Sequence, residues 1–328
     1  MASATGQTGP DSLPEITFVS LPHKPTARLA VRYLAAQTAS EDAPPTLVVF
    51  LNGMMTTAAS WTTTIAQLLP SLPSKHNISL LTYDRYGQGE SDRDPSDATS
   101  PDPSHGHNLL SSAEDLSHLV QHFSTPHQPR LILVGNSIGC ALARVYAERF
   151  PARAPHALLL LDSILAHVNM LSLFPDPDAS GFEPGSLPEG VTESGLRATR
   201  MFMAKVFDPA NGSAEGLSRR DLASLLPRAG GPRLLLPGGK HGPLVTVVGH
   251  GSERFAAESA ASGMDAASVL AYLQPCWERY NEELLLITSD QQGRRGIQAV
   301  GAGHFVQRDR PDIVTAELLT LLEKIGAV

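Results

Sequence analysis

Short runs of consecutive apolar residues, separated by turn residues and helical patterns, constrain the fold of this chain most strongly. Eight candidate strands occur in the order ITFVSL, ARLAVRYLAA, TLVVFLNG, ISLLTYD, RLILVG, HALLLLDS, PLVTVVG and GIQAV. From the third run onward apolar residues are continuous rather than alternating, as in strands that are covered on both faces. The sequence therefore predicts an α/β fold with a mostly parallel eight-stranded sheet and helices on both faces.

Five amphipathic segments lie between or after these runs and are the candidate helices. They cover residues 57–69, 111–123, 137–150, 268–280 and 312–325. Pro311 directly precedes the last segment, in the manner of a first-turn proline. Pro275 lies inside the fourth segment, where it predicts a break.

The stretch between the sixth and seventh candidate strands is much longer than a simple crossover helix requires. An inserted, mainly helical cap at residues 164–240 explains this length, which leaves residues 15–163 and 241–328 as the core and residues 1–14 as a disordered tail. Methionine and phenylalanine side chains of the cap could form the apolar roof of a cavity. They are Met170, Phe174, Met201, Phe202, Met203 and Phe207.

Composition excludes several classes of function. The formal net charge is -8 and no polybasic block occurs, which argues against a nucleic-acid-binding surface. Only two cysteines, Cys140 and Cys276, are present, so a disulfide framework is not expected and a reducing compartment is favoured. The N-terminus lacks the pattern of a signal peptide, and no apolar run reaches the roughly 18 residues of a membrane span. We therefore expect a cytoplasmic protein without a membrane span.

A serine lies between two glycines where an apolar strand pattern changes to a helical one, in RLILVGNSIGCALARVYAERF. Gly135 and Gly139 flank Ser137 at two residues on each side, which permits a sharp turn between strand and helix. Such a nucleophile elbow would lift the Ser137 hydroxyl clear of the backbone. The N–H of Ile138, at the start of the helix, would then be available to a developing negative charge.

A histidine follows the last candidate strand, in GAGHFVQRDRP, and here the sequence resembles the α/β-hydrolase superfamily. The resemblance is carried by FLNGM, YDRYGQGES, GNSIG and GAGHFVQRDRP, and it spans nearly the whole chain outside the tail and cap. It implies that His304 is the general base for Ser137. It also implies an oxyanion hole formed by the N–H groups of Met54 and Ile138, where Gly53 lets the backbone approach. Asn52 replaces the histidine often found before that glycine.

The acid that orients the base has two candidates. Asp162 ends the sixth strand pattern, and Glu253 follows the seventh, where the family more commonly places its acid. The spacing around Glu253 departs from the usual turn, whereas many family members carry a non-catalytic aspartate at the position of Asp162. A carboxylate is needed to fix the tautomer of His304, and Asp162 is the predicted acid, with Glu253 as the alternative.

The resemblance predicts a serine hydrolase that forms an acyl-enzyme on an ester, lactone or thioester of a medium-sized, largely apolar small molecule. No cofactor or metal is required. Candidate substrate-binding residues are Asn52, Gly53, His250, Met201 and Phe202. The same residues could also serve an acyltransferase, a carbon–carbon bond hydrolase or a cyclase of a biosynthetic pathway. A ligand-binding receptor or pseudoenzyme on this scaffold is the alternative from another class, since fold does not fix activity.

Overall fold

A single mixed sheet organises the chain. The computed structural model describes residues 14–37, 44–124, 128–236, 241–289 and 293–328, so the expected tail lies almost wholly outside the described residues. The strands are β1 (Thr17–Leu21), β2 (Lys24–Leu34), β3 (Thr46–Leu51), β4 (Ile78–Tyr83), β5 (Arg130–Asn136), β6 (Ala157–Leu161), β7 (Leu244–His250) and β8 (Arg294–Ala299). Each of the eight predicted strand runs overlaps one of them, which confirms the predicted α/β fold.

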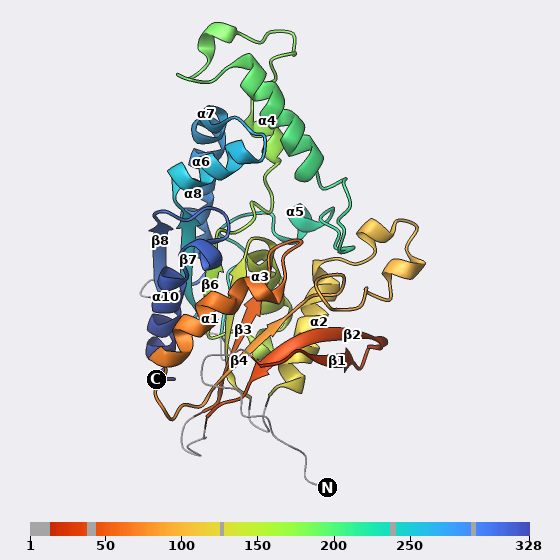
Figure 1. The fold of residues 1–328 in the computed structure, drawn as a ribbon, viewed down its shortest axis with the longest axis vertical. Coiled ribbons are helices and arrows are strands. Elements are labelled where there is room, and N and C mark those ends of the chain that lie inside the picture. Colours follow the sequence, from red (N-terminus) through yellow and green to blue (C-terminus); the bar gives the residue numbers. More distant parts are fainter. Residues whose placement is uncertain (1–13, 38–43, 125–127, 237–240, 290–292) are drawn as a thin grey trace.

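The strand order is β1-β2-β4-β3-β5-β6-β7-β8 (Figure 1). β1 pairs with β2 and β2 with β4 in antiparallel fashion, and every later pair is parallel. In the parallel part, the carboxyl ends of β3, β5, β6 and β7 therefore meet at one edge of the sheet. That edge is where open α/β sheets bind ligands.

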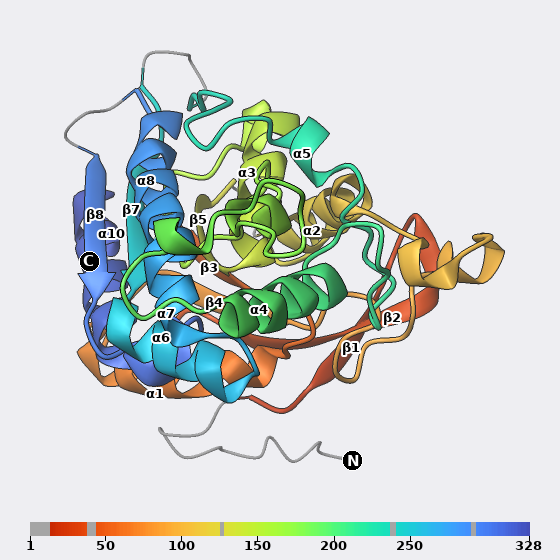
Figure 2. The same cartoon turned by 90° about the horizontal axis from the view of Figure 1, so that it is seen from above.

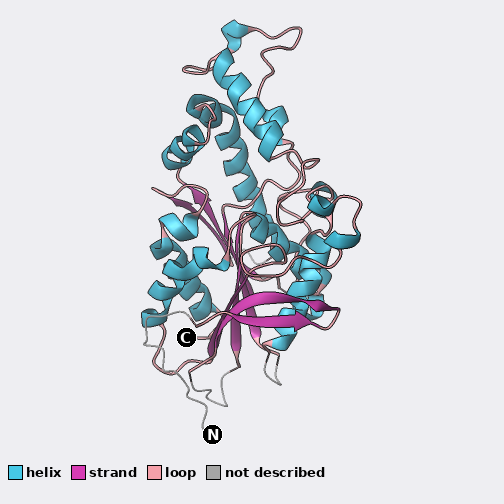
Figure 3. Ribbon diagram, turned by 45° about the vertical axis from the view of Figure 1, so that its right-hand side comes forward, coloured by secondary structure: helices cyan, strands magenta, loops and turns pink. Residues whose placement is uncertain are grey.

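Helices cover both faces of the sheet (Figures 2 and 3), and the central strands are therefore buried on both sides. One face packs against α2 (Leu109–His122), α3 (Ile138–Arg149) and α8 (Gln274–Leu284), and the other against α1 (Thr62–Leu68), α9 (Val306–Asp309) and α10 (Pro311–Lys324). Alternate residues of one strand serve the two cores: Val49 lies in the first cluster and Val48 in the second. This is the packing that continuously apolar strands require.

The helical segment after β7 differs in detail from the prediction. α6 (Ser252–Ala261) is followed by α7 (Ala266–Ser268), a π-helical stretch (Val269–Leu273) and then α8. The predicted break at Pro275 takes the form of a change from π- to α-helical winding. Pro275 lies in the first turn of α8, directly after the π-helical stretch.

Residues 164–236 form a long insertion between β6 and β7, and its main helix is α4 (Glu193–Val206) (Figure 1). α5 (Leu222–Leu225) is shorter than the predicted helical stretch, and short 3₁₀ turns, Met170–Leu173 and Pro184–Ser186, account for the rest of its regular structure. Thr192 caps α4 by accepting a hydrogen bond from the N–H of Gly195. Figure 1 shows α4 beyond the sheet edge at which the parallel strands end.

Candidate active site

Ser137 occupies a sharp turn between β5 and α3. Its φ angle is +55°, an uncommon value for a residue that is not glycine. The turn is tight, since a Cβ atom at Gly135 would lie 2.7 Å from backbone atoms of Gly139, and one at Gly139 would lie 2.3 Å from the carbonyl oxygen of Leu51. Both glycines flanking the serine are thus required by close approach of the backbone. The strain at Ser137 is held by the packed strand and helix on either side.

Three polar groups around this turn form no hydrogen bond in the described structure. Within the described part of the chain, the Ser137 hydroxyl has no hydrogen-bond partner, and neither do the backbone N–H groups of Ile138 and Met54. Ser137 is only 9% exposed. Its hydroxyl is not hydrogen-bonded to His304 here, although such bonds are often loose until substrate is present.

Asp162, at the end of β6, contacts His304, the candidate base. The Nδ1 atom of His304 lies 2.6 Å from Oδ2 of Asp162, which is fully buried, while a quarter of the His304 side chain is exposed. Asp162 also has a positive φ angle of +44°, which lets the chain turn out of β6 with its carboxylate facing the loop that carries His304. Burial raises the pKa of Asp162, but the charge and hydrogen bonds of His250 and the hydrogen bond of His304 outweigh burial and lower it.

Asn136 ties the serine turn to the histidine loop. Its side-chain amide donates to the carbonyl oxygens of His304, at 3.0 Å, and of Leu161, at 3.2 Å. Its own side-chain oxygen accepts from Nε2 of Gln307 at 3.3 Å. One residue therefore connects the three loops that carry Ser137, Asp162 and His304, because it is adjacent in sequence to Ser137 and bonded to the other two loops.

A second histidine contacts the other oxygen of Asp162. Nδ1 of His250 lies 2.7 Å from Oδ1 of Asp162, and Nε2 of His250 lies 2.7 Å from Oε1 of Gln274. His250 is buried and its ring stacks on Phe255 with centroids 3.9 Å apart. Burial lowers the pKa of His250, but the Asp162 carboxylate outweighs it and raises the pKa overall.

The loop after β3 is fixed by two donors from the loop after β4 and by one of its own. Gly53's carbonyl oxygen accepts from Nη2 of Arg85 at 3.0 Å, from Nε2 of Gln88 at 2.9 Å and from Oγ1 of Thr56 at 3.1 Å. In a trans peptide the N–H points opposite to the carbonyl, so the N–H of Met54 points away from these donors. A Cβ atom at Gly53 would lie 3.5 Å from Cβ of Ser137, which places this loop beside the serine.

Arg85 also connects this loop to the insertion. Its guanidinium donates to the carbonyl oxygen of Asn52 at 2.6 Å and forms a buried ion pair with Glu215 at 3.2 Å. Gly87 has a φ angle of +81°, and a Cβ atom there would lie 2.1 Å from the carbonyl oxygen of Glu215. The insertion is therefore seated against the loop that carries Met54.

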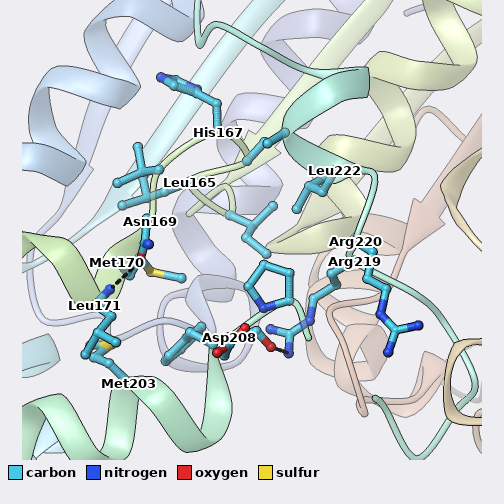
Figure 4. Close-up of a pocket in the computed structure, with 16 residues that line it drawn as sticks. Leu165, His167, Asn169, Met170, Leu171, Met203, Asp208, Arg219, Arg220 and Leu222 are labelled. Atoms are coloured by element: carbon cyan, nitrogen blue, oxygen red, sulfur yellow. Dashed lines mark hydrogen bonds between the residues drawn. The ribbon is translucent and has the colours of Figure 1, made fainter. Parts of the chain in front are cut away.

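A cavity of about 220 Å³ lies within the insertion, between the segment at its start, Ile164 to Leu171, and the residues that follow from Met203 to Ala223 (Figure 4). Figure 4 shows Met170 and Met203 on one side and Leu222 with Arg219 on the other. Arg219 donates to the carbonyl oxygens of Val206 and Asp208, at the end of α4. Ile164 also lines the cavity, and its N–H donates to the carbonyl oxygen of Ser137 at 3.3 Å.

The other candidate residues predicted from the sequence lie outside the Ser137, Asp162 and His304 cluster. The side chain of Asn52 is buried and bonded to Tyr83, Gln88 and Trp61, so it is a structural support of the loop. Glu253 is exposed on α6 and has no bond to His304 in the described structure. The last two candidates lie on α4.

Of these two, Met201 is 71% exposed and is not among the residues lining the cavity of Figure 4. Phe202 packs against Phe207, which does line it. His250 faces the back of Asp162 rather than that cavity.

Several residues of the site were not found from the sequence. Asn136 is the variable residue before the serine in the GNSIG motif. The signal that could have identified it is a polar residue at the end of an apolar strand. Gln274 and Glu215 gave no local signal, because each finds its partner far away in the sequence.

Known proteins share this fold. Residues 48–317 match the model of the alpha/beta hydrolase family, and the chain belongs to that family. No curated protein gave a significant match. Among solved structures, a putative aryl esterase from Burkholderia cenocepacia is 16% identical, with a TM-score of 0.50 and coverage of 94% of this chain and 98% of that one.

Two further structures share the fold. The enol-lactonase from Burkholderia xenovorans LB400 is 16% identical, has a TM-score of 0.50, and the match covers 94% of this chain and all of that one, 100%. A structure reported among epoxide hydrolases from metagenomes of hot environments is 17% identical, with a TM-score of 0.53 and coverage of 95% and 99%. At these identities the likeness concerns the fold.

Neither a metal cluster nor a membrane-crossing helix is found among the described residues. No group of three or more His, Cys, Asp or Glu side chains there could hold a metal ion. No helix there is long and apolar enough to cross a bilayer.

Proposed function

We propose that this protein is a serine hydrolase that cleaves an ester, lactone or thioester through an acyl-enzyme. The observation that carries the proposal is the 2.6 Å contact between His304 and Asp162, at the sheet edge where Ser137 stands on a strained turn. A buried carboxylate on Nδ1 fixes the tautomer that leaves Nε2 free to act as a base. On this geometry Asp162 is the acid, rather than the exposed Glu253.

In the proposed reaction, His304 removes the proton of Ser137 as the hydroxyl oxygen attacks the carbonyl carbon. The N–H groups of Met54 and Ile138, which have no other acceptor in the described structure, receive the oxyanion. His304 then protonates the leaving group, and the acyl group remains on Ser137. Water activated by His304 releases the acid and restores the serine.

The cavity of Figure 4 supports a largely apolar substrate. Leu165, Met170, Met203, Phe207 and Leu222 all line it, and Ile164 links it to the backbone of Ser137. We propose that the insertion is a cap and that this cavity holds the acyl chain or alcohol of the substrate. Flexible methionine side chains suit a pocket that adapts to its ligand.

Labelling with a fluorophosphonate tests the catalytic assignment. We expect wild-type protein to be labelled on Ser137 alone and to hydrolyse p-nitrophenyl esters, whereas Ser137→Ala and His304→Ala lose labelling and turnover. Mass spectrometry locates the adduct. An adduct on another serine, or turnover that survives Ser137→Ala, would refute the assignment.

The cavity is tested separately by filling it. Ala223 is exposed and lines the cavity, so Ala223→Trp should raise KM for longer acyl chains more than for acetyl esters. Ser224→Trp, at the next position but not in the lining, is the matched control and should leave the chain-length profile as in wild type. The same profile in both variants would show that the substrate does not use this cavity.

A further inference from the structure

We propose that His250 is held as an imidazolium cation and acts as a positioning residue that sets the charge balance of Asp162, and through it the protonation of His304. This inference rests on the proposed function, because it concerns the same triad. Asp162 gives one carboxylate oxygen to each histidine: Oδ2 to His304 at 2.6 Å and Oδ1 to His250 at 2.7 Å. The acid of the triad is therefore shared.

Both ring nitrogens of His250 face oxygen atoms that accept hydrogen bonds. Nδ1 faces the Asp162 carboxylate, which has no proton to donate, and Nε2 faces Oε1 of Gln274 at 2.7 Å. A neutral imidazole has only one N–H, so one of these two contacts would lack a proton. Only the imidazolium form donates to both.

The orientation of the Gln274 amide decides this argument, and Glu278 fixes it. Nε2 of Gln274 donates to Oε1 of Glu278 at 3.0 Å. If the amide were turned over, its oxygen would face the carboxylate oxygen of Glu278 with no proton between them. Glu278 is exposed on α8, and its charge is among the causes that raise the pKa of His250. A chain of contacts thus runs from His304 through Asp162, His250 and Gln274 to the surface.

The surroundings of His250 can hold a buried cation. The charged or titratable groups that face it are Asp162 at the end of β6, His304 in the loop before α9, and Glu278 with Glu282 on α8. From α6 the ring of Phe255 stacks on it at 3.9 Å, and Glu258 of that helix accepts from the N–H of His304. A cation over an aromatic face is favourable, and a carboxylate in contact with a histidine favours the charged form of the ring.

A permanent positive charge on the far side of Asp162 opposes a second one on His304. The catalytic base must be neutral to accept the serine proton, so His250 keeps His304 in its working form at lower pH. Removal of the His250 charge would let His304 bind a proton more easily. The acid side of the activity profile would then move to higher pH.

The first experiment measures the rate of Ser137 labelling by a fluorophosphonate against pH, in wild type and His250→Asn. The Asn amide can still donate to Asp162, but it carries no charge. We expect the acid limb of the variant to lie on the order of one pH unit higher, from the interaction of unit charges a few ångströms apart. A purely structural role would lower the rate at every pH and leave the limb in place.

A second experiment changes an exposed residue at the surface end of this chain of contacts. Glu278→Gln removes the charge that orients Gln274, so His250 can become neutral, and the limb should move in the same direction by a smaller amount. Glu283→Gln is the matched control, because Glu283 is an exposed carboxylate on the same helix that in the described structure has no bond to Gln274 and does not line the pocket beside His250. An acid limb that stays in place in both His250→Asn and Glu278→Gln would overturn the proposal.

The charge itself is read in wild-type protein by proton–nitrogen NMR of the histidine side chains. We expect His250 to show two protonated ring nitrogens at neutral pH, and assignment is made by loss of the signals in His250→Asn. One protonated and one bare nitrogen would overturn the proposal. Absence of Ser137 labelling in wild type would instead refute the proposed function, so the two failures are distinguishable.

Discussion

At the scale of single residues, the proposed site depends on three residues, each of which lies at or after the end of a strand. Ser137 and Asp162 both have positive φ angles, and His304 follows β8 in a glycine-containing loop. Such backbone strain is retained where surrounding structure compensates for it. The side chains of a turn, a strand end and a loop are thereby brought to one edge of the sheet.

The identity of the acid is tested by two matched substitutions. Asp162→Asn should lower kcat by about 10⁴, as loss of the acid does in serine proteases, because His304 would no longer be held in the working tautomer. Glu253→Gln should remain close to wild type, since Glu253 is exposed and not bonded to His304. Steady-state hydrolysis of a p-nitrophenyl ester measures both. A large loss in Glu253→Gln would contradict the assignment.

The stability of the protein should depend on pH through His250. The Asp162 carboxylate raises the pKa of His250 above its usual 6.5, so the folded state binds this proton more tightly than the unfolded state. The stabilisation is complete below pH 6.5 and is lost as the pH rises through the folded-state value. The difference in melting temperature between wild type and His250→Asn should therefore be largest in acid and narrow towards alkaline pH. A constant difference would argue against this linkage.

The site residues that could be predicted are those in local motifs. Ser137 lies between Gly135 and Gly139, a spacing that indicates a sharp turn, whereas the role of His304 was implied by its glycine-containing loop together with the resemblance to the α/β-hydrolase superfamily. The acid remained open between two carboxylates, because the choice depends on how each strand end turns in three dimensions. The roles of His250 and Gln274 could not be read, since their partners come from separate elements.

At the scale of elements, the packing of α3 against the sheet depends on the absence of a side chain at Gly139, in its first turn. Gly139→Ala would place a Cβ atom 2.3 Å from the carbonyl oxygen of Leu51. Because this oxygen belongs to the backbone, no change of a side-chain rotamer can relieve the clash. We expect a loss of about 3 kcal/mol in the free energy of unfolding. Gly185→Ala is the control, because its Cβ atom would meet nothing within 4 Å. Chemical denaturation compares them, and equal stability of the two variants would contradict the argument.

The strands could be predicted better than the helices of the insertion. Continuous apolar runs such as residues 131–135 are long enough and apolar enough to identify buried strands. The insertion has few such runs, and α5 is only a short helix where a longer one was expected. Its conformation is set by tertiary contacts, such as those of Glu215, which local patterns do not encode.

At the scale of the whole molecule, the insertion and the core are joined by the buried Arg85–Glu215 ion pair. Glu215→Gln would leave the guanidinium buried without a countercharge and should cost about 3 kcal/mol of stability. kcat should fall with little change in KM, because Arg85 supports the loop that carries Met54. Thermal unfolding and steady-state kinetics measure the two effects.

The control for that prediction is Glu193→Gln, which removes a partner of Arg197 on the exposed side of α4. Surface ion pairs contribute little, so its melting temperature should stay close to wild type. Equal effects of the two substitutions would show that the Arg85–Glu215 pair does not join the insertion to the core.

The amide of Asn136 has a consequence for how such a molecule would lose activity on heating. Because one side chain connects the segments that carry the three proposed triad residues, these residues are expected to separate in a single event rather than one by one. Turnover should then persist until the sheet itself melts, and the thermal inactivation curve should coincide with the loss of secondary structure.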